Sequence, residues 1–107
     1  MPAKSSFVLI YDPEVAVHLN TIDRKYYSLI QRTVEKQLSY EPETETRNRK
    51  PLRRPSVFGT AWELRFGPDN RFRVFYRTDR PSREVHILAI GLKIDNRLFV
   101  GEEEFEL

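Results

Sequence analysis

The chain has 107 residues, a formal net charge of +2 and no cysteine. This length predicts a single domain over residues 1–107, and the 39% of apolar residues are enough to fill one core. The absence of cysteine excludes disulfides, thiolate metal sites and cysteine nucleophiles. The N-terminal apolar run, Phe7 to Tyr11, is too short for a membrane span or a signal-peptide core. We therefore expect a cytoplasmic protein with no membrane partner.

The N-terminal part predicts a strand followed by a helix. Residues 7–11, Phe-Val-Leu-Ile-Tyr, form an aromatic and β-branched run that indicates a buried strand. In Asp12-Pro13-Glu14, Asp is a favoured N-cap and Pro is a favoured first helical residue, so a helix starts here and runs to about Asn20. Its apolar stripe consists of Val15, Leu19 and Ile22.

A second helix follows directly. Asn20, Thr21 and Asp23 interrupt the apolar pattern and offer caps for a helix that ends near Ser39. Two antiparallel helices joined by a tight turn are the expected result. The second helix has an apolar face at helical spacing, made of Tyr26, Leu29, Ile30, Val34 and Leu38.

Residues 40–60 form a long connection for which the sequence predicts no secondary structure. Pro42, Pro51 and Pro55 keep it extended. Connections of this length are uncommon in compact domains and are often functional.

Alternation of apolar and polar residues then predicts two strands, over residues 62–66 and 72–77, that form a hairpin. Residues 85–94 are almost continuously apolar and predict a central strand covered on both faces. Residues 98–100 suit a last short strand, and the tail after them is acidic. The order β-α-α-β-β-β indicates an α+β domain: a small antiparallel β-sheet with an N-terminal helical hairpin packed on one face. Two helices cover only one face of such a sheet, so we expect the other face to be polar or occupied by a partner.

The alternation also sorts charged residues onto the face away from the helices. Glu63, Arg65 and Arg73 share that face. In the strand over residues 85–94, Lys93 has the parity of Ile87, Ala89 and Gly91, and the small residues would leave room above the sheet. We therefore expect Glu63, Arg65, Arg73 and Lys93 to converge, with Phe75 adding aromatic character.

The stretch TRNRKPLRRP, residues 46–55, contains five cations and no acid. Such residues are typical phosphate contacts, which position a nucleic acid without reading its sequence. Charged strands and loops are also common on plain solvated surfaces, but clustering of one sign favours binding. Leu52 is expected to anchor the stretch in the core. The candidate nucleic-acid contacts are Arg47, Arg49, Lys50, Arg53 and Arg54.

The two histidines are read as structural. His18 is expected to be a partly exposed helix residue, and His86 shares the core parity of Leu88 and Ile90. Because there is no His pair at ligand spacing, no metal site is predicted. Because the glycines are scattered, no phosphate loop is predicted either, and we expect no cofactor.

As an ordered set, several short motifs resemble the RelE/ParE superfamily, the small bacterial toxins of type II toxin–antitoxin systems. The resemblance covers nearly the whole chain and implies a small antiparallel sheet with two helices on one face. The motifs are Asp12-Pro13-Glu14, Lys50-Pro51-Leu52, Trp62-Glu63-Leu64-Arg65, Phe72-Arg73-Val74-Phe75-Tyr76 and Ala89-Ile90-Gly91-Leu92-Lys93.

The resemblance implies two activities. RelE-like members are ribosome-dependent endoribonucleases that cut mRNA in the ribosomal A site, by attack of the RNA 2′-OH on its own phosphate and without a metal. ParE-like members inhibit DNA gyrase instead. Either kind is neutralised by a cognate antitoxin, and the basic stretch is therefore expected to grip nucleic acid or to dock an acidic antitoxin segment.

For the RelE-like activity, the resemblance implies catalytic roles residue by residue. Arg65 and Arg73 are candidates for stabilising transition-state charge, and Glu63 is a candidate general base. Lys93 falls near the family's catalytic position, after the last long strand. RelE-like nucleases often carry a Tyr or His near the C-terminus, but residues 94–99 contain neither. A ParE-like gyrase inhibitor and a non-catalytic antitoxin- or RNA-binding homologue therefore stay open as alternatives.

Overall fold

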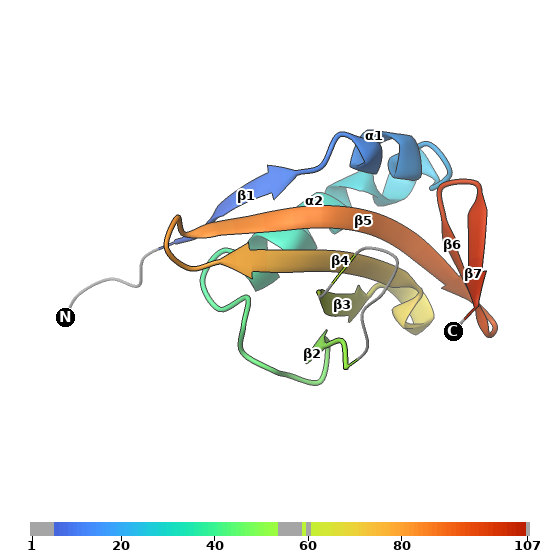
Figure 1. The fold of residues 1–107 in the computed structure, drawn as a ribbon. Helices are drawn as coiled ribbons and strands as arrows, with labels where there is room; N and C mark the ends of the chain where they lie inside the picture. Colours follow the sequence, from blue (N-terminus) through green and yellow to red (C-terminus); the bar gives the residue numbers. More distant parts are fainter. Residues whose placement is uncertain (1–5, 54–58, 60, 107) are drawn as a thin grey trace.

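The fold is described by a computed structural model, which covers residues 6–53, 59 and 61–106 (Figure 1). It is a small α+β domain, so the predicted fold class is confirmed at this level. Its elements are β1 (Val8–Tyr11), α1 (Glu14–Leu19), the 3-10 helix η1 (Arg24–Tyr26), α2 (Tyr27–Leu38), β2 (Arg49–Pro51), β3 (Trp62–Phe66), the 3-10 helix η2 (Pro68–Asn70), β4 (Phe72–Asp79), β5 (Glu84–Ile94), β6 (Arg97–Val100) and β7 (Glu103–Glu106).

The strands of the described residues form one sheet in the order β2-β3-β4-β5-β6-β7. These neighbours are antiparallel, as predicted. β1 is the exception, because it pairs with the first half of β5 in parallel. The last part of β5 pairs with β6, and α1 packs against β5 (Figure 1).

Two aspartates accept hydrogen bonds at the starts of helical segments: Asp23 is the N-cap of η1, whereas Asp12 precedes Pro13, which is the N-cap of α1 in place of the predicted Asp12. The side chain of Asp12 accepts a hydrogen bond from the backbone N–H of Glu14 at 2.9 Å, and that of Asp23 accepts one from Lys25 at 3.0 Å. Each bond satisfies a helix N–H that has no partner within the helix. None of the described helices is long and apolar enough to cross a membrane.

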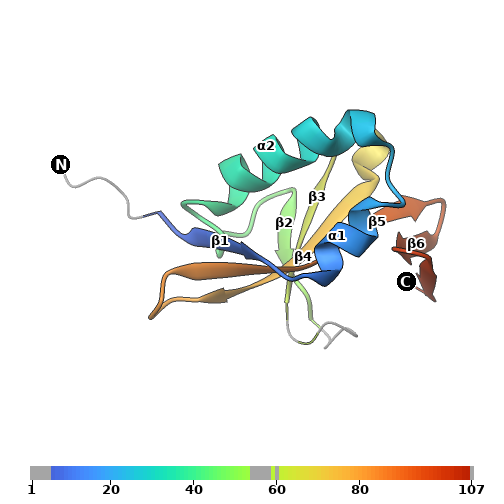
Figure 2. The same cartoon turned by 90° about the horizontal axis from the view of Figure 1, so that it is seen from above.

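The main core lies between the helices and one face of the sheet. α2 runs along this face in Figure 2 and buries Ile30, Val34 and Leu38. The predicted alternation is confirmed in β3 and β4, because the alternate apolar residues of both strands join this core. The sheet residues of the core are Leu64, Phe66, Phe72, Val74, Tyr76, Val85, Ile87 and Ile90.

The strand predictions need three corrections. β1 is not fully buried, because Val8 and Tyr11 at its ends are 61% and 43% exposed. The basic stretch contains a strand, β2, although residues 40–60 were expected to have none. The acidic tail contains another, β7, which pairs with β6.

A β-bulge reverses the expected alternation in the first half of β5. Phe75 pairs with Ala89, but Tyr76 pairs with Ile87, so Leu88 is the extra residue of β5. Ile87 therefore joins the main core instead of sharing a face with Lys93. For the same reason, His86 does not have core parity with Ile90 as predicted.

The second face of the sheet is partly covered by the chain itself. Phe75, Ala89, Leu98 and Val100 form a small buried apolar cluster there, which we call the second cluster. Leu52 and Phe105 pack against it. The expectation of a polar or partner-covered face is therefore wrong for the β5–β7 half. The buried ring of Phe75, 4% exposed, is not the open aromatic surface that was expected.

Candidate nucleic-acid interface

The basic stretch is split between two faces by strand β2. Arg49 and Lys50 are successive strand residues, so their side chains point to opposite faces. Lys50 pairs in register with Glu63 of β3 and therefore belongs to the second face. Its side chain is 47% exposed, and its ammonium lies 3.8 Å from the carboxylate of Glu45. The sequence interpretation treated Lys50 as a loop cation, but β2 places it beside the sheet cations.

Arg49 points the other way and is buried, with 7% of its surface exposed. Its guanidinium donates hydrogen bonds to the carbonyl oxygens of Gln37, at 2.8 Å, and of Glu41. Gln37 lies in the last turn of α2, where free carbonyls favour a cation. The exposed position expected for Arg49 as a phosphate contact is therefore wrong, and it holds the end of α2 instead.

Three predicted site residues meet on the second face. Glu63 is 4% exposed and lies between Arg65 and Arg73. One carboxylate oxygen accepts from the Nε of Arg65 at 2.6 Å, and the other accepts from an Nη of Arg73 at 3.4 Å. We call these three residues the Glu63 triad. The predicted convergence of the triad is confirmed as geometry, although Glu63 and Arg73 are buried and not solvent-exposed.

Arg73 is the inner cation of the triad. Its side chain is 7% exposed, and its Nε donates to the carbonyl oxygen of Asn70 at 3.0 Å. Burial lowers the pKa of Arg73; the charge of Glu63 acts in the opposite direction, and the charge of Arg65 adds to the lowering. Arg73 stays charged all the same, because a guanidinium is not deprotonated in proteins.

Lys93 joins Arg73 at a recess of about 380 Å³ where β4 begins and β5 ends. Backbone pairing holds the two sides together, because the N–H of Lys93 donates to the carbonyl oxygen of Arg71 at 2.7 Å. Arg71 itself was not predicted as a site residue. Its signal was present in the sequence, since it has the strand parity of Arg73. The recess is lined by Asp69, Arg71, Arg73, Lys93, Ile94 and Asp95.

The other predicted contacts are placed less specifically. Arg47 and Arg53 are exposed on either side of β2, and Arg54 lies outside the described residues. Leu52 is half-buried against the second cluster, so its packing against apolar residues is confirmed, although on the second face of the sheet and not in the main core. Gly91 does not open space above the sheet, because a Cβ there would lie 2.6 Å from the carbonyl oxygen of Phe99.

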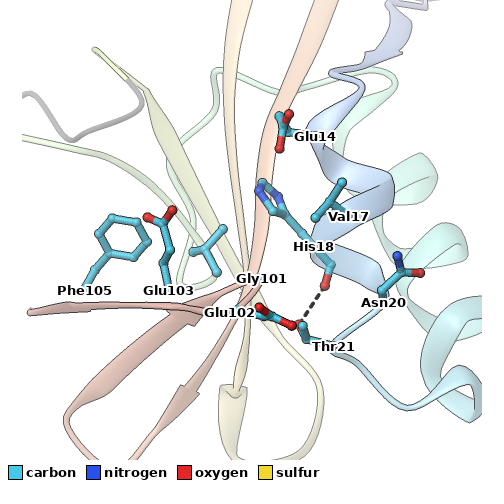
Figure 3. A pocket seen from close by; sticks show the side chains of 10 residues that line it. Glu14, Val17, His18, Asn20, Thr21, Gly101, Glu102, Glu103 and Phe105 are labelled. Carbon is cyan, nitrogen blue, oxygen red and sulfur yellow. Dashed lines mark hydrogen bonds between the residues drawn. The ribbon is translucent and has the colours of Figure 1, made fainter.

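A second hollow, of about 560 Å³, lies between α1 and the β6–β7 hairpin (Figure 3). Glu14 lines it from the helix, and Glu102 and Glu103 line it from the hairpin, so its rim is acidic. His18 lies at its wall with 9% of its surface exposed, which corrects the expectation of a partly exposed helix residue. Within the described residues, no group of three or more His, Asp or Glu side chains is arranged to hold a metal ion.

The acidic hollow and the cationic recess differ in whether they suit a phosphate group. The recess and the Glu63 triad place Arg65, Arg71, Arg73 and Lys93 on adjoining parts of one sheet face. Planar guanidinium groups bind phosphate through paired hydrogen bonds. The cations of this face therefore suit a phosphate group, although the recess is also lined by Asp95 and by Asp69, which lies 3.7 Å from the guanidinium of Arg71. Among the described residues, the lining of the other hollow contains no Arg or Lys, and its acidic rim would repel phosphate.

Comparison with protein-family models finds no match for this chain, and comparison with curated proteins finds none either.

Proposed function

We propose that this chain is the toxin of a type II toxin–antitoxin system and acts as a RelE-like, ribosome-dependent mRNA endoribonuclease. The observation that supports this function most directly is the recess at which Arg73 and Lys93 meet, next to the Glu63 triad. The reaction class, cleavage of mRNA on the ribosome, is inferred from the ordered motifs that resemble the RelE/ParE superfamily. The α+β fold with an antiparallel sheet is compatible with it.

The reaction needs positive charge at one phosphate. The RNA 2′-oxygen attacks the adjacent phosphorus, the bond from phosphorus to the 5′-oxygen breaks, and the products carry a 2′,3′-cyclic phosphate and a 5′-hydroxyl. The 2′-OH loses its proton to a base, and the leaving oxygen takes up a proton. Negative charge grows on the non-bridging oxygens, where the guanidinium of Arg73 and the ammonium of Lys93 would stabilise it.

The exposed cations of the basic stretch would hold the RNA on either side of this phosphate. Lys50 shares the second face with the Glu63 triad, because it pairs with Glu63. Arg47 and Arg53 flank it along the chain and are exposed. Contacts of this kind go to the phosphate backbone and position the strand without reading bases.

The test is cleavage of mRNA by purified protein on programmed ribosomes. We expect the unmodified chain to cut the message and Lys93→Ala to lose activity by about 10²–10³-fold, as for the removal of one transition-state donor. Arg77→Ala is the matched control, because Arg77 is an exposed cation of β4 that pairs with His86, away from the recess. An uncut message at full ribosome occupancy contradicts the proposal.

The proposal includes a cognate antitoxin that covers the cationic face. An acidic segment suits the cations, and an apolar one suits the rim of the second cluster. Co-expression with the product of the adjacent small gene should give a stable complex and restore growth. Growth arrest that every neighbouring gene product leaves unchanged contradicts this part.

A second candidate function is ParE-like inhibition of DNA gyrase. It is favoured by the described lining of the recess, which contains no Tyr and no His to transfer a proton. A supercoiling assay with purified gyrase separates the two. Inhibited supercoiling with intact mRNA supports the gyrase function, and cut mRNA with unaffected supercoiling removes it.

A further inference from the structure

Arg65 and Arg73 face each other in register on neighbouring strands. Like charges directly opposite each other destabilise a sheet. Glu63 separates them, because each of its two carboxylate oxygens contacts a different arginine, at 2.6 Å and 3.4 Å. The carboxylate is thus the link that lets two guanidinium groups lie side by side on one face.

We propose that Glu63 is a positioning residue that fixes Arg65 and Arg73 for phosphate binding, and that it is not the proton acceptor of the reaction. A general base must reach the hydroxyl whose proton it takes. Both oxygens of Glu63 are engaged by arginines, and Glu63, unlike Arg73, is not among the residues that line the recess. Where it concerns RNA cleavage, this inference rests on the proposed function.

Fixing matters because a flexible arginine loses side-chain entropy when it binds a ligand. Arg73 is held at two points, by Glu63 and by the carbonyl oxygen of Asn70. These contacts occupy two of its five N–H donors and leave three for a phosphate. A preorganised pair binds an anion more tightly than two mobile arginines of the same charge.

Two variants separate positioning from plain electrostatics. Glu63→Gln removes a negative charge, so charge alone predicts tighter binding of inorganic phosphate. Positioning predicts the opposite, a loss of about tenfold, equivalent to about 1.4 kcal/mol. Glu63→Asp keeps the charge but is one methylene shorter, and we expect it to weaken phosphate binding as well.

NMR of the two guanidinium groups tests directly whether Glu63 holds them in place. In the unmodified protein, NMR signals of the Arg65 Nε–H and of the Arg73 Nη–H that Glu63 accepts should be resolved and slow to exchange with water, and Glu63→Gln should remove that protection. If either signal exchanges freely in the unmodified protein, the inference is wrong, and this measurement stands even if a variant does not fold. Phosphate binding that is equal or tighter in Glu63→Gln also overturns it.

Cleavage assays distinguish this inference from the proposed function. If Glu63 only positions, Glu63→Gln raises KM and keeps the acid limb of the pH–rate profile. If the acid limb disappears while phosphate affinity is unchanged, Glu63 is the base and the inference is wrong. A chain that protects both guanidinium groups and binds phosphate but cuts no RNA supports the positioning role and refutes the proposed nuclease.

Discussion

The imidazole Nδ1 of His18 accepts a hydrogen bond from the backbone N–H of Ile90 at 3.3 Å. Ile90 lies in β5 between the residues that pair with β1 and those that pair with β6. A side chain from α1 therefore takes the place of a neighbouring strand at this point of the sheet edge. The contact requires an unprotonated Nδ1, so it exists only in the neutral form of His18.

The first prediction is that folding stability falls below neutral pH through His18. Burial lowers the pKa of His18 from its usual 6.5, while Glu14, Asp12 and Glu103 act in the opposite direction. Because the folded-state pKa is lowered, the unfolded chain binds the proton more readily. The stability contribution is therefore complete above about pH 6.5 and is lost as the pH falls toward the folded-state pKa.

Thermal melts at pH 7.5 and pH 5.5 measure this effect. His18→Gln should be less stable at pH 7.5, by about 1–3 kcal/mol, if the N–H of Ile90 is left without a partner. Its stability should also depend less on pH. His86→Gln is the control for the loss of a histidine and should keep the His18 part of the slope. An equal pH dependence in His18→Gln and the unmodified chain would show that His18 is not the titrating group.

Much of the fold could be predicted from short local patterns in the sequence. Asp12 and Asp23 accept hydrogen bonds from the backbone at the starts of their helical segments, near the positions that the sequence indicated, because such bonds join residues only two positions apart. The period-two alternation placed Glu63 and Arg73 on one face, since β3 and β4 pair without interruption from Trp62 and Tyr76 to Phe66 and Phe72. That alternation made the Glu63 triad predictable.

The residues whose positions were predicted wrongly from the sequence depend on pairing between strands, which local patterns do not contain. The bulge at Leu88 depends on how β5 pairs with β4, and it reversed the faces expected for Ile87 and His86. Arg49 and Lys50 are adjacent cations of similar appearance in the sequence. Only the pairing of β2 with β3 decides that one is buried under α2 and the other is exposed.

The second prediction compares these two neighbours. Arg49→Met keeps much of the side-chain volume but removes the guanidinium donor from the carbonyl oxygens of Gln37 and Glu41, of which the second still accepts from the N–H of Thr44. We expect a loss of about 1–3 kcal/mol in the free energy of unfolding. Lys50→Met should cost about 0–1 kcal/mol, because the ion pair of Lys50 with Glu45 is exposed. Chemical denaturation of both variants measures the difference, and equal losses would mean that Arg49 does not hold the end of α2.

The third prediction concerns Leu52, which packs half-buried against the second cluster. Leu52→Ala should cost roughly 1–2 kcal/mol, less than for a fully buried leucine, because part of the side chain already contacts water. In thermal melts this corresponds to a decrease in Tm of about 4–8 °C per kcal/mol. Val8→Ala is the control, since Val8 is 61% exposed and should change stability by about 0.5 kcal/mol or less. A Tm of Leu52→Ala equal to that of the control would remove the anchoring role.

The last prediction tests whether the basic stretch grips phosphate. Lys50→Ala combined with Arg53→Ala should weaken binding of single-stranded RNA and flatten its salt dependence by roughly 1.4 units of slope, because each lost contact removes about 0.7. Arg32→Ala combined with Lys36→Ala removes the same net charge from exposed positions of α2. That control should keep the slope of the unmodified chain. RNA affinities measured at three or more salt concentrations give the slopes. If both double variants flatten the slope equally, RNA is attracted by net charge alone; if neither does, the stretch is not a phosphate contact, and an acidic antitoxin segment becomes the expected occupant.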